Sequence, residues 1–255
     1  MYAELHALSN FTFLRGASQP AELVARAHEL GYRALAITDE CSLAGIVRAH
    51  VAAKERGLPL LVGAQFRLDD GLRFVALATD RAAYGALASF ITRGRRAAGK
   101  GSYLLTRADL DNALDRCLVL WLPGIRPAAG EGRWLRERFA GRLWLAVELL
   151  TSGNDRRRLA ALEQLGAELE VPCVASGDVH MHVRGRRALQ DVLTAIRLRT
   201  PVAAAGLALY PNGERHLRPL ERLAELYPPR LLEATVEIAG RCHFSSRRLA
   251  LLLVS

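Results

Sequence analysis

Short apolar runs alternate with stretches of helical periodicity through residue 177, and no other feature of the chain limits its fold as strongly. Seven runs have the composition of β-strands, at residues 2–8, 33–38, 59–66, 72–78, 117–122, 143–149 and 171–177. Most are almost continuously apolar, which is typical of parallel strands covered on both faces. Strand–helix alternation of this kind predicts an α/β barrel, either open or closed.

The predicted helices between these runs have recognisable ends. We expect the first to use Ser18 as its N-cap, to carry Pro20 in its first turn and to stop at Gly31. A second helix is expected over about 43–56, stopped by Gly57 and Pro59, and a third over about 156–170, with leucines at helical spacing.

Two departures from regular alternation are expected. The turn at residues 69–71, Asp-Asp-Gly, predicts an antiparallel hairpin between the third and fourth runs. After the last run the pattern is helical only, with helices expected over about 184–198, 219–226 and 229–243. We therefore expect an α/β barrel over residues 1–183 and a small helical continuation over 184–255.

The chain is basic, with 35 Lys and Arg against 26 Asp and Glu and a formal net charge of +9. Such a charge favours an anionic partner, and nucleic acid is the obvious candidate. The lysines are only Lys54 and Lys100, so a compositional bias toward arginine and alanine explains the charge equally well. The candidates for contact with a DNA backbone are Arg93, Arg95, Arg96 and Lys100, although a solvated helix end would look the same.

Cysteine spacing and hydropathy exclude several classes of protein. The four cysteines form no C-x-x-C pair, so neither a zinc ribbon nor a redox motif is expected. The N-terminus lacks the pattern of a secretory signal. No apolar run approaches the roughly 20 residues that cross a bilayer. We expect a soluble protein of the cytoplasm with no membrane partner.

Three of the apolar runs deliver side chains that can bind metal ions. The first contains His6, the second ends in Asp39-Glu40, and the last is followed by Asp178 and His180. Active sites of parallel barrels lie at the carboxyl ends of their strands. Clusters of imidazoles and carboxylates there can hold several metal ions for phosphoester hydrolysis.

These motifs, in this order across seven strand–helix units, resemble the PHP family of polymerase and histidinol phosphatase domains. The resemblance implies a distorted (β/α)7 TIM-like barrel, whose working members are phosphoesterases or polymerase-linked exonucleases. Longer segments, at residues 4–18, 178–197 and 210–217, are similar to bacterial error-prone DNA polymerases, the translesion relatives of the DNA polymerase III alpha subunit.

Most ligand positions implied by the family are altered. The replaced positions are Leu8, Arg15, Gln65 and Arg73. The residual ligands are His6, Asp178 and His180, with Glu40 in place of an imidazole. Guanidinium groups repel a cation, and an amide removes the charge of a carboxylate. We expect at most one weakly bound divalent metal (Mg, Mn or Zn), no other cofactor and no metal-dependent hydrolysis.

The arginines at the barrel mouth have two interpretations. Arg15 and Arg73 are expected to pair with Glu40 and Asp178, so that an ion-pair network replaces the metal cluster. The alternative is that these arginines bind a phosphate group.

The resemblance implies an N-terminal domain, or a truncated form, of an error-prone DNA polymerase. The parent enzyme is a magnesium-dependent nucleotidyltransferase that acts in DNA replication, DNA repair and damage tolerance, with DNA and other translesion-synthesis proteins as partners. Its palm domain is missing here, so we expect no catalytic residue and an isolated domain, a fragment or a frameshifted product. Two alternatives remain: a stand-alone PHP metal-dependent phosphoesterase, and a non-catalytic module that binds DNA or protein.

Overall fold

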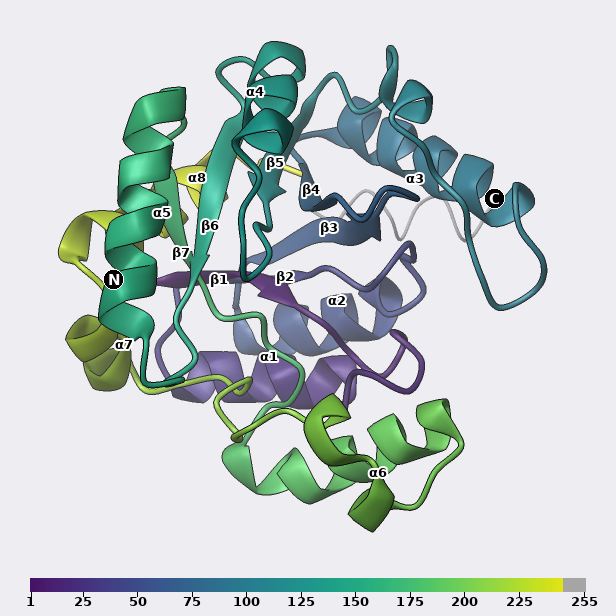
Figure 1. The fold of residues 1–255 in the computed structure, drawn as a ribbon, viewed down its shortest axis with the longest axis vertical. Coiled ribbons are helices and arrows are strands. Elements are labelled where there is room, and N and C mark those ends of the chain that lie inside the picture. The colour runs from purple at the N-terminus through teal and green to yellow at the C-terminus, as the bar shows by residue number, and fades with distance from the viewer. Residues whose placement is uncertain (245–255) are drawn as a thin grey trace.

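The computed structural model describes residues 1–244 and contains one seven-stranded sheet in the order β1 to β7 (Figure 1). The strands are β1 (Ala3–Ala7), β2 (Ala34–Ile37), β3 (Leu60–Arg67), β4 (Arg73–Ala78), β5 (Cys117–Trp121), β6 (Leu143–Glu148) and β7 (Cys173–Ser176). All seven predicted strands are therefore confirmed, each close to its expected position.

The sheet curls into a nearly closed barrel. Neighbouring strands are parallel except that β4 is antiparallel to both β3 and β5, which confirms the predicted hairpin. The first and last strands meet through the segment after β7. There the Leu8 amide donates to the Val179 carbonyl at 2.8 Å, and the Val179 amide donates to the His6 carbonyl at 3.0 Å. This junction holds the carboxyl ends of β1 and β7 together.

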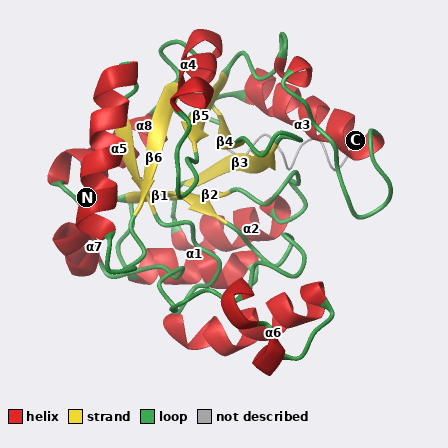
Figure 2. Ribbon diagram, in the orientation of Figure 1, coloured by secondary structure: helices red, strands yellow, loops and turns green. Residues whose placement is uncertain are grey.

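Helices cover the outside of the barrel (Figure 2). They are α1 (Pro20–Glu29), α2 (Ile46–Arg56), α3 (Arg81–Arg96), α4 (Ala129–Arg138) and α5 (Asp155–Leu169). Their buried faces carry apolar residues at helical spacing, such as Leu23, Val24 and Ala27 of α1. These side chains form the larger apolar core with the outward faces of the strands.

The predicted N-cap of α1 is wrong. Gln19 caps this helix instead, and its backbone amide donates to the Glu22 side chain at 2.8 Å. The Ser18 hydroxyl is not available, because it bonds to Nδ1 of His182 at 2.8 Å. The predicted stop at Gly31 is confirmed, since Gly31 follows the helix with φ of 70°, a conformation that favours glycine.

The barrel interior is packed with apolar side chains, most of them small or branched, and is closed at one end by α8 (Pro229–Gly240). Ile238 of α8 belongs to this interior cluster. Thr235 accepts a hydrogen bond of 3.0 Å from the backbone amide of Ala3, at the start of β1. α8 thus lies against the amino end of the barrel, and the opposite end forms the mouth.

The remaining α-helices, α6 (Arg187–Leu198) and α7 (Leu220–Leu226), follow the barrel, as predicted. The same part of the chain contains the short 3₁₀ turns η2 (Arg184–Arg186), η3 (Val202–Ala204) and η4 (Gly206–Ala208), and another, η1 (Ala108–Leu110), lies between α3 and β5. The domain boundary at residue 183 stays a prediction, and the apolar run 249–254 lies outside the described residues. None of the described helices has the length and apolar character needed to cross a bilayer.

Candidate functional site

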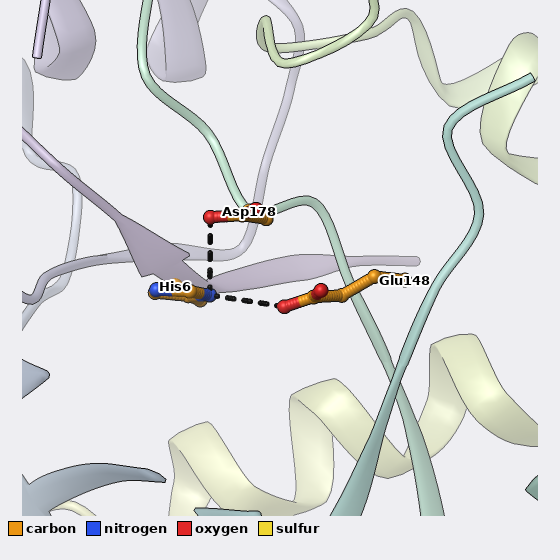
Figure 3. Close-up of side chains that lie close together, drawn as sticks. All are labelled: His6, Glu148 and Asp178. Atoms are coloured by element: carbon orange, nitrogen blue, oxygen red, sulfur yellow. Dashed lines mark ion pairs between the residues drawn. The ribbon is translucent and has the colours of Figure 1, made fainter. Parts of the chain in front are cut away.

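Three buried, metal-capable side chains meet at the mouth of the barrel (Figure 3). They are His6 on β1, Glu148 at the end of β6 and Asp178 two residues after β7. His6 Nδ1 lies 3.5 Å from Oε1 of Glu148 and 3.8 Å from Oδ1 of Asp178. One ligand atom from each residue lies within 4.8 Å of the others. This triad is the candidate metal site.

The turn after β7 aims Asp178 at the triad. Asp178 has φ of 43°, a left-handed conformation that is uncommon for a residue with a side chain. The preceding Gly177 allows close approach, because a Cβ there would lie 2.2 Å from Oε2 of Glu4. Glu4 in turn accepts hydrogen bonds from the amides of Gly177 and His6 and from the Tyr2 hydroxyl. This buried carboxylate therefore fixes β1 against the turn that carries Asp178.

The hydrogen bond between His6 and Gln65 sets the protonation of the imidazole. Nε2 of His6 lies 2.7 Å from the amide oxygen of Gln65, which only accepts, so Nε2 carries a proton. Nδ1 is buried, points toward two carboxylates and makes no hydrogen bond within the described part of the chain. With the proton on Nε2, the lone pair of Nδ1 faces the carboxylates of Glu148 and Asp178. A cation bound between these three side chains would satisfy that arrangement.

Glu148 responds to the positive charge around it. Burial would raise its pKa, but the contact with His6 and the charges of His6, Arg215 and Arg73 outweigh that effect and lower the pKa to about 2. Glu148 is therefore a carboxylate at neutral pH, as a metal ligand or an ion-pair partner must be.

Arg215 enters the mouth from the segment between α6 and α7. Its guanidinium contacts Oδ2 of Asp178, and its carbon Cζ lies 4.1 Å from the ring centre of Tyr210. The backbone carbonyl of Arg215 accepts from the amide of His180 at 2.9 Å, which anchors the segment to the turn after β7. Burial, together with the charge of Arg73, lowers the pKa of Arg215 to about 10. Asp178 therefore has a positive partner without any metal.

His180 supports Asp178 and lies outside the triad. Its Nδ1 lies 2.9 Å from the amide nitrogen of Gln190, which donates, so Nε2 carries the proton and donates to Oδ1 of Asp178 at 3.0 Å. Burial and the charges of His6 and Arg15 lower the pKa of His180 to about 3. A neutral His180 therefore orients Asp178 at neutral pH.

The ion pairs at the mouth agree only in part with the predicted network. Arg15 pairs with Glu40 at 2.7 Å, and the Tyr103 hydroxyl donates to the other oxygen of Glu40 at 2.8 Å. The predicted role of Arg73 as a partner of Asp178 is wrong, because Asp178 pairs with Arg215. Arg73 acts on the site through its charge, which contributes to the lowered pKa of Glu148.

The other singled-out positions have structural surroundings. Leu8 is buried and apolar. Asp39 accepts from the amide and hydroxyl of Ser9 at 2.8 and 2.7 Å and from the Thr12 hydroxyl at 2.7 Å. This carboxylate holds the loop after β1 and has no oxygen directed at the triad.

The four candidates for DNA contact divide into two pairs. Arg93 bonds to the carbonyl of Asp109 at 2.7 Å, and Arg95 bonds to the carbonyls of Cys41 and Glu40 at 3.1 and 3.2 Å. Both arginines therefore hold α3 to neighbouring loops. The other two, Arg96 and Lys100, are exposed and make no ion pair within residues 1–244.

The sequence interpretation missed Glu148 and Arg215. Glu148 carries the signal used for the other candidates, because it is an acidic residue at the carboxyl end of an apolar run. No local pattern identifies Arg215, since its place depends on how the chain returns to the mouth after α6.

The donor set fits one divalent cation. One imidazole nitrogen and two carboxylate oxygens are ligands that Mn²⁺ or Zn²⁺ accepts, and the orphaned Nδ1 of His6 faces the position between them. Within residues 1–244 this is the only group of three such side chains. Arg215 opposes a cation through its contact with Asp178. The site therefore has ligands for one ion, held against a nearby positive charge.

The chain is similar in sequence to known proteins. Residues 4–125 match the PHP domain family. The error-prone DNA polymerase of Methylococcus capsulatus is 58% identical over 246 residues, which is 96% of this chain and 24% of the relative. The error-prone DNA polymerase of Dechloromonas aromatica is 57% identical over 248 residues, which is 95% of this chain and 24% of the relative. The chain thus spans about a quarter of the length of these curated relatives.

Solved structures with low sequence identity share the fold. A protein described as a metal-dependent phosphoesterase, from Bifidobacterium adolescentis, has a TM-score of 0.53 at 18% identity and aligns over 70% of this chain and 87% of its own. An amidohydrolase from Chromobacterium violaceum has a TM-score of 0.56 at 16% identity and aligns over 71% of this chain and 88% of its own. The predicted distorted (β/α)7 barrel is therefore confirmed.

Proposed function

The chain carries a PHP domain of the kind found in error-prone DNA polymerases, and from this premise we propose that it is an architectural domain of such a polymerase. In this proposal the barrel covers residues 1–183, and the helical continuation from residue 184 leads toward the polymerase body. The whole enzyme would use Mg²⁺ to copy damaged DNA in the cytoplasm, in translesion synthesis and DNA repair, with other translesion-synthesis proteins.

The observation that carries the proposal is the pairing of mouth carboxylates with arginines. Arg15 holds Glu40, and Arg215 holds Asp178. Positive side chains thus neutralise acidic groups that would otherwise need metal ions to be stable at the mouth. A network of this kind stabilises the barrel with no catalytic step.

Residual metal binding is part of the proposal. His6, Glu148 and Asp178 would hold at most one divalent ion, with Gln65 fixing the imidazole and His180 fixing Asp178. A bound divalent ion can activate water and stabilise charge on phosphorus. The polymerase-type site proposed here lacks ligands for a second ion, because Arg15 engages Glu40 and position 65 is an amide.

The domain role is tested with a chimera. The aligned quarter of the Methylococcus capsulatus polymerase is replaced by this chain, and primer extension over an abasic template is measured. We expect activity within about tenfold of the parent enzyme, because 58% of the aligned residues are identical. A chimera that is folded and monodisperse but inactive would contradict the proposal.

A second candidate function is a stand-alone phosphoesterase, which the orphaned Nδ1 of His6 favours. Metal analysis after dialysis against Mn²⁺, together with a chromogenic phosphodiester assay, separates the two. We expect no more than one ion per chain and no turnover above that of the Asp178→Asn variant. Two or more ions with turnover that this variant lacks would establish the hydrolase instead.

The third candidate is a non-catalytic module that binds DNA. Arg96 and Lys100 are its available contacts. Fluorescence anisotropy with a short duplex, between 50 and 200 mM salt, measures the number of phosphate contacts from the slope. If log affinity depends less steeply on log salt concentration in the Arg96→Ala/Lys100→Ala variant than in the parent chain, this candidate is favoured.

A further inference from the structure

Helix α6 exposes its apolar face and buries a polar one. Its buried side chains include Gln190 and Thr194. On the opposite side, Leu189 is 39%, Val192 43% and Ile196 55% exposed. These three residues follow the spacing i, i+3, i+7 and therefore form one stripe along the helix. A helix that only covers its own barrel would bury its apolar face and expose its polar one.

More exposed apolar residues follow in the sequence. Leu198 ends α6, Val202 and Leu207 lie in the segment after it, and all three are exposed. The turn η3, which contains Val202, lies against α6. Together these residues form the α6 patch: Leu189, Val192, Ile196, Leu198, Val202 and Leu207. Six of the twelve large apolar side chains that are exposed within residues 1–244 thus fall in one stretch of nineteen positions. Exposed apolar clusters of this kind mark interaction surfaces.

The orientation of α6 is fixed by polar contacts, so the patch cannot turn inward. The side-chain amide of Gln190 donates to Nδ1 of His180 at 2.9 Å and to the carbonyl of Arg15 at 3.4 Å. The Thr194 hydroxyl donates to the carbonyl of Gln190 at 3.0 Å, a bond within the helix. Rotating the helix would break the contacts of Gln190 with His180 and Arg15 and leave those buried groups unpaired. Figure 1 shows α6 at the edge of the molecule, below α1, where its outer face is accessible to another surface.

We propose that the α6 patch is the surface through which this barrel docks on the body of the longer polymerase, at an apolar area with acidic residues on its edge. The inference rests on the proposed function. The relatives have about three quarters of their length outside the aligned region, so in those proteins the matching region has a large neighbour in the same polypeptide.

The charges around the patch define the partner. Arg184, Arg186 and Arg187 pair with Glu214, Glu22 and Asp191. The exposed Arg197 and Arg199 form no ion pair within the described residues, so an acidic rim on the partner would complement them. A second copy of this chain, packed about a twofold axis, would instead bring the same arginines together, which is unfavourable. Nucleic acid would gain little from the apolar stripe.

Thiol labelling tests the proposal. Val192→Cys is introduced into the isolated chain and into the polymerase chimera, and the rate of maleimide labelling is compared. We expect labelling in the chimera to be at least tenfold slower. The matched control is Val51→Cys on α2, which is 53% exposed and carries no part of the patch, and its rate should change less than twofold. Equal rates at position 192 in both proteins, or equal slowing at both positions, would overturn the proposal.

A charged variant gives an independent readout. Val192→Asp/Ile196→Asp should leave the melting temperature of the isolated chain unchanged, since both side chains are exposed. In the chimera it should accelerate proteolytic release of the barrel at least tenfold. An unchanged release rate would overturn the docking surface. So would light scattering that shows a dimer of the isolated chain dissociated by the same substitutions, because a second copy would then be the occupant.

The labelling result does not depend on catalysis. An active chimera in which Val192→Cys labels at the rate of the isolated chain contradicts the docking surface alone. A folded but inactive chimera contradicts the proposed function, whichever rate is observed.

Discussion

Replacing Arg215 by methionine should destabilise the barrel and at the same time create a better metal site. Methionine keeps much of the side-chain volume next to Tyr210 and removes only the guanidinium that contacts Asp178. Two unit charges about 4 Å apart attract each other by about 4 kcal/mol at an effective dielectric constant of about 20. Removing one partner of a buried pair costs about 3–5 kcal/mol, because the other charge stays buried.

The expected loss is measurable by thermal unfolding. For a chain of this size each kcal/mol corresponds to roughly 2–4 °C, so Arg215→Met should lower the melting temperature by about 10 °C. The matched control is Arg230→Met, which removes an exposed ion pair with Glu163 and should cost less than about 1 kcal/mol. The double variant Asp178→Asn/Arg215→Met should recover part of the loss, because no unpaired carboxylate remains on Asp178.

Metal binding should change in the opposite direction. Without Arg215, a cation can replace the lost charge between Glu148, Asp178 and His6. Mn²⁺ at a hundredfold excess over its dissociation constant would restore about 2.7 kcal/mol. Mn²⁺ should stabilise the parent chain much less, and it should not stabilise the double variant Arg215→Met/His6→Ala. An Arg215→Met melting temperature equal to that of the parent, or equal stabilisation of both proteins by Mn²⁺, would refute the reasoning.

The remaining predictions concern groups around the triad. His180 has a pKa of about 3 in the folded chain against an ordinary 6.5, so the unfolded state binds more protons as the pH falls from about 6.5. Stability should then decline toward pH 4 by up to about 1.4 kcal/mol per pH unit from this group, and urea titrations should show a flatter profile for His180→Gln. A slope unchanged by that substitution would argue against a neutral buried ring. Gly177→Ala should lower the free energy of unfolding by about 2 kcal/mol or more in urea titrations, because the added Cβ would meet the Glu4 carboxylate. The matched control is Gly185→Ala, which should be neutral because no atom lies within 4 Å of a Cβ added there. Equal effects at the two glycines would remove the steric argument. Asp39→Asn should lower the free energy of unfolding by about 1–3 kcal/mol in the same measurement, because an amide nitrogen would face hydroxyl and amide donors. An unchanged free energy of unfolding would show that Asp39 does not hold the loop after β1.

Local patterns were sufficient to predict the strands, the hairpin and the late helices. Each strand is a nearly continuous apolar run, and burial on both faces selects that composition wherever the strand pairs. The turn at residues 69–71 specified the reversal between β3 and β4 by its own backbone preferences. The N-cap of α1 could not be predicted in the same way. The competitor for the Ser18 hydroxyl is His182, which is distant in the sequence and reaches Ser18 only in the folded chain.

Candidate ligands were identified where a local signal exists, at the ends of strands. His6 and Asp178 lie there, and Glu148 lies there too, although it was overlooked. Which groups pair was decided by the tertiary structure alone. Arg73 and Arg215 are both arginines near the mouth, and only the path of the chain after α6 brings the second of them onto Asp178. Strand formation depends on near neighbours in the sequence, whereas the electrostatics of the mouth depend on distances between segments that are far apart in the sequence. Only folding sets those distances.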